Sequence, residues 1–277
     1  GTAGGGGHSF EIARRLVGGR LICIDQDSAA IEAASAKLAP FSDKVTVVRN
    51  NFSNIAEVCA RLGVEKIDGM LLDLGVSSHQ LDTAERGFSF RYEAPLDMRM
   101  NQEATLTAAD IVNNYSQEDL EKILRLYGEV DNSRKLAQLI CKARETAPIN
   151  TTTELGKAIE SVLPKFAEHK FLAKVYQALR IEVNQEMKSL EKFLTGAAKS
   201  LKPGGRLVII TYHSLEDRMV KNFIKAGNIE GKVEKDFYGN ATAPLKAVNR
   251  KPILPQEEEI ASNTRARSAK LRIAEKI

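Results

Sequence analysis

Short apolar runs alternate with amphipathic segments along much of the chain. The runs with the length and composition of buried strands are 20–25, 44–49, 67–73, 206–212 and 270–274. One segment with helical spacing, 10–16, precedes the first run, and two more, 28–38 and 53–62, lie between the first three runs. We expect Ser53 to cap the last of these helices. Because strands that alternate with helices form parallel sheets, the pattern predicts an α/β protein with a doubly wound, Rossmann-like sheet.

The strand pattern stops in the middle of the chain. Four short amphipathic helices are predicted there, at 107–112, 117–127, 131–145 and 152–163. A long helix at 173–194 then leads back to the sheet. We therefore predict a discontinuous α/β domain of residues 1–101 and 179–277, interrupted by an all-helical insertion of residues 102–178.

A glycine-rich stretch from Gly1 to Ser9 runs directly into the first predicted helix. Such a turn lets the backbone approach a ligand, and the helix that follows directs unpaired N–H groups at it. An acidic residue, Asp25, ends the next strand at about the distance expected for a ribose-binding carboxylate. The pair indicates a nucleotide-like cofactor. The alternative is a flexible glycine-rich tail.

The residue types at the end of the glycine-rich loop discriminate among three cofactors. A P-loop requires Lys where this chain has His8, which disfavours ATP and GTP. A dinucleotide fingerprint requires a third glycine where this chain has Ser9, so NAD fits poorly. S-adenosylmethionine carries no pyrophosphate, and a loop of this kind with a ribose-binding carboxylate suits it best.

A strand should precede such a glycine loop, but nothing precedes Gly1, and the sequence has no initiator Met. We therefore expect the first, central strand of the sheet to be missing from this chain, together with any acidic residue just before the glycines.

The ends of the predicted strands supply further candidate chemistry. Ligands of doubly wound sheets bind outside the carboxyl ends of the strands, so Asp25, Phe52 and Asp73 should line one crevice. Phe52 would lie beside the cofactor or pack into the core. His213 follows the strand at 206–212, before a helix that we expect Ser214 to cap, with Asp217 at the third helical position. His213 is either a proton acceptor or a hydrogen-bonded residue at a strand end.

Composition restricts the class of protein. The chain has 277 residues, 43% of them hydrophobic, and a net charge of +4, which permits an anionic partner without demanding one. No apolar run is long enough to span a membrane and no signal peptide is visible, so we expect a cytoplasmic protein. The three cysteines and four histidines have no metal-ligand spacing, so we predict no metal site.

Several motifs together resemble one family, the bacterial 16S ribosomal RNA (cytosine-N4)-methyltransferases known as MraW or RsmH. The matching blocks are Gly1 to Ser9, Leu72 to Phe90, Pro95 to Met100, Gln177 to Ile181, Tyr212 to Arg218 and Asn263 to Ser268. The resemblance spans nearly the whole chain, and strings this long and unusual are specific.

The resemblance implies a Rossmann-like methyltransferase with a helical substrate-recognition insertion. The activity implied is methyl transfer from S-adenosylmethionine to the N4 amino group of a cytidine in the decoding region of 16S rRNA, within the small ribosomal subunit. Cofactor contacts are implied at Gly6, Gly7, His8, Asp25, Phe52, Asp73 and Gln80. The oligomeric state is open, with a homodimer among the options.

The chemistry of the reaction adds candidates. The amino nitrogen of cytosine is a poor nucleophile, so the enzyme must position it and accept its hydrogens. Asp73 is the best acceptor by position, with Tyr212 and His213 as further catalytic candidates. Aromatic side chains hold unstacked bases, and arginines contact phosphates. Candidate RNA contacts are Arg86, Phe88, Phe90, Arg99, Arg218, Arg265 and Arg267.

Other classes stay open. The nearest alternative is an amino-methyltransferase acting on DNA or another RNA. A non-catalytic RNA-binding protein would result if the incomplete N-terminus abolished the site. An NAD oxidoreductase is disfavoured by Ser9.

Overall fold

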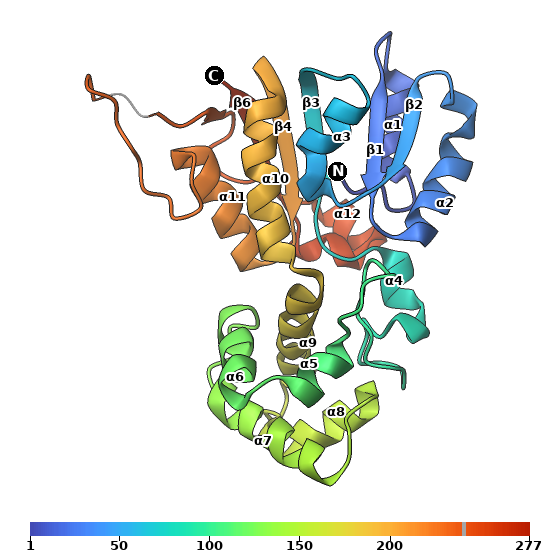
Figure 1. Cartoon of the computed structure of the whole chain (residues 1–277), viewed down its shortest axis with the longest axis vertical. Helices are drawn as coiled ribbons and strands as arrows, with labels where there is room; N and C mark the ends of the chain where they lie inside the picture. Colours follow the sequence, from blue (N-terminus) through green and yellow to red (C-terminus); the bar gives the residue numbers. More distant parts are fainter. Residues whose placement is uncertain (240–241) are drawn as a thin grey trace. The chain divides into compact units, whose positions relative to one another are not determined.

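The computed structural model describes residues 1–239 and 242–277, and the chain forms two compact units. One unit comprises Gly1–Gly75 and Met187–Ile277 and is α/β, whereas the other, Val76–Glu186, is helical (Figure 1). The chain therefore passes between units at residues 75/76 and 186/187, whereas the sequence analysis places the limits at 101/102 and 178/179.

The strands of the α/β unit form two sheets. The strands are β1 (Leu21–Asp25), β2 (Val45–Arg49), β3 (Ile67–Asp73), β4 (Leu201–Thr211), β5 (Leu245–Ala247) and β6 (Lys270–Lys276). β1 and β2 pair in parallel, and the second sheet has the order β3-β4-β6-β5. β3 and β4 are parallel, whereas β6 is antiparallel to both β4 and β5. All five predicted strands are present, and short β5 is the addition.

Helices cover both faces of these strands because the strand residues alternate. In β1, Cys23 belongs to a cluster with α1 (Gly7–Arg15) and α2 (Ser28–Leu38), whereas Ile24 packs into the main core with α3 (Ile55–Arg61) and α10 (Glu186–Ser200). α3 and α10 approach closely at Gly196, where a Cβ would lie 2.8 Å from the side chain of Ile55. In Figure 1, α3 and α10 lie in front of β3 and β4, and α1 lies behind β1.

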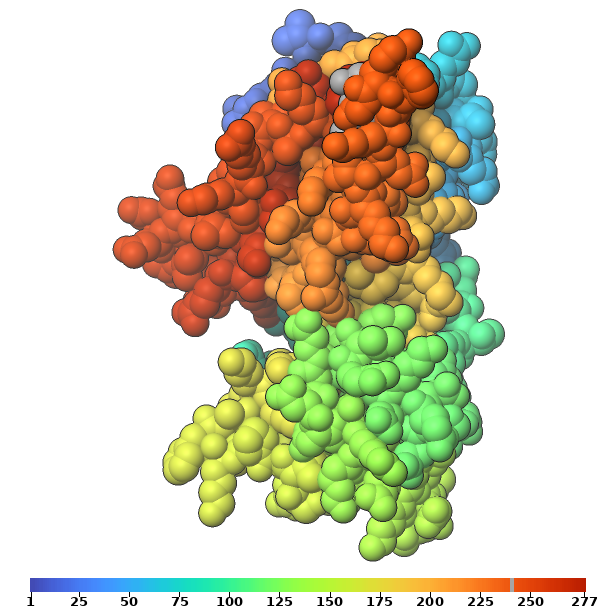
Figure 2. Space-filling view, turned by 90° about the vertical axis from the view of Figure 1, so that its left-hand side faces the viewer, coloured from blue at the N-terminus to red at the C-terminus, as the bar shows by residue number. Residues whose placement is uncertain are grey.

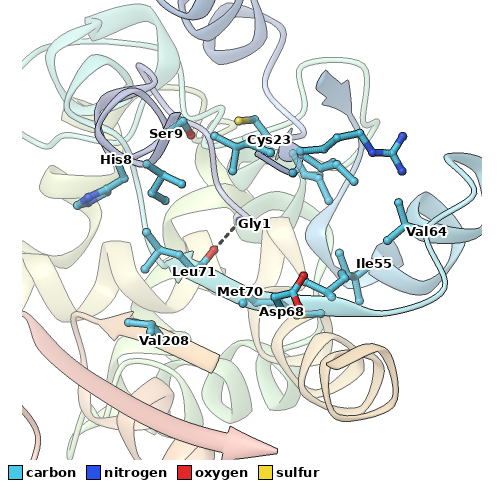
Figure 3. Close-up of a pocket in the computed structure, with 18 of the residues that line it drawn as sticks. Gly1, His8, Ser9, Cys23, Ile55, Val64, Asp68, Met70, Leu71 and Val208 are labelled. Carbon is cyan, nitrogen blue, oxygen red and sulfur yellow. Dashed lines mark hydrogen bonds between the residues drawn. The ribbon is translucent and has the colours of Figure 1, made fainter. Parts of the chain in front are cut away.

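The sheet is interrupted between β1 and β3, where the sequence analysis expects a central strand. Residues 1–3 occupy one end of this gap, since the Gly1 amino group donates to the Leu71 carbonyl at 2.6 Å and the Ala3 N–H donates to the Ile24 carbonyl at 2.9 Å. From them a cavity of about 770 Å³ extends toward the starts of β1 and β3, lined largely by apolar residues of β1, α3 and β3 (Figure 3). The described part of the chain thus leaves the facing edges of β1 and β3 without a strand between them.

The helical unit has its own core. Its helices are α4 (Ser78–Asp82), α5 (Ala108–Asn114), α6 (Gln117–Leu126), α7 (Ser133–Thr146), α8 (Thr152–Ile159) and α9 (Glu168–Asn184). The fully buried side chains of Ile111, Leu124, Leu136 and Leu155 come from four of these helices and pack into one cluster. Thr107 and Thr151 begin α5 and α8 with complete capping boxes, which explains where these two helices start.

Two predicted helix limits are wrong. The single helix expected at 173–194 is two helices, because Gln185 adopts a left-handed conformation (φ 49°) that ends α9 before α10 begins. Ser53 does not cap α3; it lies in a 3-10 turn, Phe52–Asn54, whose cap is the Asn51 side chain.

The remaining helices are α11 (Ser214–Ala226), α12 (Glu257–Ser262) and the 3-10 turns Ala39–Phe41, Ala84–Arg86, Glu160–Val162 and Thr264–Ser268. Over the residues that the structure describes, no helix combines the length and apolarity needed to span a membrane.

Candidate active site

The glycine loop exposes backbone at the start of α1. Gly4 and Gly6 adopt positive φ angles of 50° and 75°, which favour glycine. Gly6 caps α1, and a Cβ there would lie 3.3 Å from the Ala34 backbone of α2, so glycine also permits the close approach of these helices. A Cβ added at Gly4, Gly5 or Gly7 would meet nothing within 4 Å. The loop backbone therefore has open space around Gly4, Gly5 and Gly7 into which a ligand can approach closely.

Asp25 connects the glycine loop to the end of β1. Its two carboxylate oxygens accept hydrogen bonds from the N–H groups of Gly4 at 2.9 Å and Asp27 at 3.0 Å. Burial raises the pKa of this carboxyl, while these bonds lower it. The structure thus joins the loop and the carboxylate that the sequence analysis paired by spacing alone.

Asp73, at the end of β3, is the centre of a hydrogen-bonded group. The Tyr212 hydroxyl donates to one carboxylate oxygen at 2.9 Å, and His8 Nε2 lies 3.3 Å from the other. The Thr2 hydroxyl donates to the Asp73 carbonyl oxygen and accepts a hydrogen bond from the Asp73 N–H at 3.1 Å. Two separate parts of the chain, the residue after β4 and the start of α1, therefore contact this carboxylate, and Thr2 holds its backbone.

Sheet topology explains this convergence. β3 and β4 are adjacent and parallel, so Asp73 and Tyr212, which follows β4, emerge at the same edge of the sheet. Gly75 has a φ of 89°, which favours glycine in the turn after β3. A Cβ there would only touch the Tyr212 ring, at 3.6 Å.

The two partners of Asp73 have altered acidity. The hydrogen bond with Asp73 raises the pKa of His8, which is more than half exposed. Burial and the Asp73 charge raise the pKa of Tyr212 well above its usual value. Tyr212 is thus a fixed hydrogen-bond donor, whereas His8 can exchange a proton with solvent.

Phe52 packs toward the core. Its ring meets Phe193 of α10 edge to face, with centroids 5.6 Å apart, and it is only partly buried. Of the two alternatives for Phe52, the structure shows the core contact.

His213 is the N-cap of α11, so the prediction that Ser214 holds this place is wrong. Glu216, not Asp217, occupies the third helical position and completes the capping box. The Glu216 carboxylate also accepts the Tyr212 N–H at 2.8 Å and lies 3.1 Å from His213 Nε2. Asp217 instead forms an ion pair with Arg272 at 2.7 Å. Glu216 is the residue that the sequence analysis missed, although its place three residues after the cap could have revealed it.

The large cavity between β1 and β3 is distinct from the group around Asp25. Gly1, Thr2, His8 and Asp73 line it, but Asp25 and Phe52 are not among its lining residues, and its walls are largely apolar. Figure 3 shows His8 and Ser9 on one side of Gly1 and the β3 residues Met70 and Leu71 on the other.

Several predicted RNA contacts serve the helical unit itself. The Arg86 guanidinium is buried and donates to the carbonyls of Arg99 and Met100 at 2.8 and 3.2 Å. Phe88 is buried as well, and Phe90 packs edge to face on Tyr176. Arg99 forms an ion pair with Asp97 at 2.6 Å. The side chains of this loop therefore mainly hold the loop together.

Gln80 also has a local role, because it completes a capping box with Ser77 at the start of α4. In the α/β unit, Arg218, Arg265 and Arg267 are exposed, and the last two lie in the 3-10 turn Thr264–Ser268. These three arginines keep the accessibility that an RNA contact requires.

Parallel strand pairs β1–β2 and β3–β4 with a glycine loop, a carboxylate at the end of β1 and a polar group at the end of β3 are typical of a Rossmann-like enzyme that binds a nucleoside cofactor. The model of the MraW methylase family matches residues 1–277, and the chain belongs to that family. It is therefore an S-adenosylmethionine-dependent methyltransferase, and the fold, family and cofactor predicted from the sequence are confirmed.

Related proteins align with this chain over nearly their full length. A ribosomal RNA small subunit methyltransferase H of Bacteroides thetaiotaomicron is 55% identical over 99% of this chain and 89% of its own length. Proteins of the same name from Cytophaga hutchinsonii and Flavobacterium johnsoniae are each 51% identical. They align with 99% and 100% of this chain and with 91% and 90% of their own lengths.

Proposed function

We propose that this chain methylates the N4 amino group of a cytidine in 16S rRNA, within the small ribosomal subunit. The name shared by the relatives supports the rRNA substrate. The observation that carries the choice of an amino group is the Asp73 carboxylate, which is held at a strand end by Tyr212 and His8. A fixed carboxylate can accept the hydrogens of an amino group and align its nitrogen.

The residues of the glycine loop suit S-adenosylmethionine. Gly6 caps α1, Gly7 and His8 are its first two residues, and a Cβ at Gly7 would meet nothing within 4 Å. The Asp25 carboxylate at the end of β1 would receive ribose hydroxyls. Phe52 and Gln80 would contact the adenine and the methionine end, respectively, as the resemblance implies. When bound, the cofactor supplies an electrophilic methyl group.

Asp73, Tyr212 and His8 have separate roles in removing the proton from the target amino group. Asp73 accepts a hydrogen bond from the target amino group, which orients the nitrogen lone pair toward the methyl group. Tyr212 keeps one carboxylate oxygen in place through its hydroxyl. His8, partly exposed and 3.3 Å from the other oxygen, passes the released proton to solvent. His213 is the weaker candidate because its side chain caps α11.

We assign RNA recognition to the helical unit, Val76–Glu186, and to the exposed arginines of the α/β unit. The candidates are Arg86, Phe88, Phe90, Arg99, Arg218, Arg265 and Arg267. Arg218, Arg265 and Arg267 are the strongest of them because they are exposed. A substrate in the ribosome would place the enzyme in the cytoplasm.

Methyl transfer from labelled S-adenosylmethionine tests the proposal. The acceptors are small ribosomal subunits, free 16S rRNA and DNA, and the product is digested to nucleosides for chromatography. We expect N4-methylcytidine from subunits and much less from either free nucleic acid. Label in DNA alone would support the alternative substrate, and label on a ring carbon would exclude the amino-group mechanism.

A further inference from the structure

A second pocket, of about 400 Å³, lies in the α/β unit among α11, β5 and β6. Five cationic residues line it: Lys221 and Lys225 of α11, Lys246 of β5, Arg250, and Arg272 of β6. We call the first four residues and the space between them the basic pocket. Figure 2 shows the molecule from the side of these C-terminal elements, coloured orange to red.

The four charges of the basic pocket are not neutralised within the described part of the chain. All four side chains are exposed or nearly so, and none forms a hydrogen bond or ion pair among the described residues. Arg272 also lines the pocket, but Asp217 pairs with its guanidinium at 2.7 and 3.1 Å. No Asp or Glu side chain is among the described lining residues.

The acidic residue opposite Lys246 in the sheet already has an ion-pair partner. Glu275 of β6 lies opposite Lys246 in the strand register, but its carboxylate pairs with Arg206 at 2.8 Å. Lys225 lies in the last turn of α11, where a cation favours the helix, so its position has a local explanation. The other three charges have no such explanation, and their mutual repulsion opposes folding slightly.

The lining of the basic pocket also indicates how a ligand would be recognised. The apolar part of the lining includes Ile224, Leu245 and Ile273. The described lining contains no aromatic side chain on which a base could stack. Lysines act as flexible point charges and suit phosphate groups without reading bases.

We propose that the basic pocket binds backbone phosphates of the substrate RNA. The proposal rests on the proposed function, which supplies an RNA as the anion. Lys221 lies eight residues after His213, which is about 12 Å along α11 at 1.5 Å per residue. The pocket therefore holds RNA away from the reacting base and contributes affinity and register, not chemistry.

The test compares two triple variants of the full chain. One is Lys221→Gln, Lys225→Gln, Lys246→Gln, and the control is Arg61→Gln, Lys188→Gln, Lys199→Gln, which removes three exposed cations of α3 and α10. RNA affinity is measured with a 16S rRNA fragment at several salt concentrations. For the first variant we expect the slope of log affinity against log salt to decrease by about 2 to 3, since each lost phosphate contact removes about one.

Affinity at low salt should fall at least about tenfold in the pocket variant, while the affinity for S-adenosylmethionine stays unchanged and the thermal midpoint does not fall. An unchanged slope, or an equal loss in the control variant, would overturn the proposal while leaving the proposed function intact. Failure of the parent chain to bind RNA at all would overturn both proposals.

Discussion

The Tyr212 hydroxyl donates to the Asp73 carboxylate at 2.9 Å, although 139 residues separate the two in the sequence. Their contact follows from the parallel pairing of β3 and β4, which brings both strand ends to one edge. Burial and the Asp73 charge raise the pKa of this phenol, so it stays protonated and donates this bond at neutral pH. Tyr212 therefore fixes the orientation of Asp73.

Replacing Tyr212 with Phe should lower the rate of methyl transfer while leaving cofactor binding nearly unchanged. The variant keeps the ring and loses one hydrogen bond to a charged group, which contributes about 1.5 to 3 kcal/mol. We expect a rate roughly tenfold or more below that of the parent at saturating cofactor. Single-turnover kinetics would measure it, and calorimetry with S-adenosylmethionine would be the control. A Tyr212→Phe variant that is as fast as the parent would show that Asp73 needs no such support.

Replacing Asp73 with Asn separates base activation from cofactor binding. The change puts an N–H donor where the target amino group needs an acceptor, at nearly constant volume. We expect the maximal rate and the specificity constant for RNA to fall together by about a hundredfold or more. If saturating S-adenosylmethionine instead restored most of the rate, Asp73 would be a cofactor ligand only.

Replacing Asp25 with Ala should weaken S-adenosylmethionine binding by roughly 1.5 to 3 kcal/mol, the range for hydrogen bonds to a charged group. Part of this loss would come from the loop, because Asp25 also holds the Gly4 N–H. Asp68→Ala is a matched control, since Asp68 also lies in a strand and its exposed carboxylate pairs with Lys202 at 2.7 Å. Calorimetric affinities that are equal for the two variants would contradict the assignment of Asp25.

Strand positions were predictable because buried strands leave continuous apolar runs, and β1, β2, β3, β4 and β6 all lie where these runs lie. Helix ends were less predictable. The break at Gln185 depends on a left-handed residue that is not glycine, and the cap at His213 differs by one residue from the Ser214 that propensity favours.

The candidate site was partly predictable for the same reason. Asp25 and Asp73 follow strands, so topology alone places them at the edge of the sheet. The side-chain partners were not predictable, because spacing does not show that Tyr212 would turn toward Asp73 or that Arg86 would be buried under backbone carbonyls. Such contacts depend on packing between distant segments.

The raised pKa of His8 predicts a pH-dependent contribution to stability. Protonated His8 pairs with Asp73, so this contribution is fully present below the unfolded pKa of about 6.5 and is lost as the pH rises through the higher folded value. His8 is more than half exposed, and solvent screening limits the effect to a few tenths of a kcal/mol. Urea unfolding of the parent and His8→Gln should therefore differ more at about pH 5.5 than at about pH 8.5. If the difference in unfolding free energy grew with pH instead, the pKa of His8 would be lowered, not raised, in the folded state.

Gly87 should be the most sensitive glycine of the helical unit. Its φ is 69°, and an added Cβ would lie 2.2 Å from the Pro95 carbonyl oxygen and 2.8 Å from the Asp97 nitrogen. Both clashing atoms are backbone, so the loop of residues 84–100 must move, and we expect Gly87→Ala to cost about 3 kcal/mol or more. Gly156 in α8 is the control, because a Cβ there meets nothing within 4 Å and alanine should stabilise the helix by roughly 0.5 to 1 kcal/mol. Urea midpoints measured for both variants decide the matter, since equal midpoints would mean that the loop accommodates a side chain at position 87.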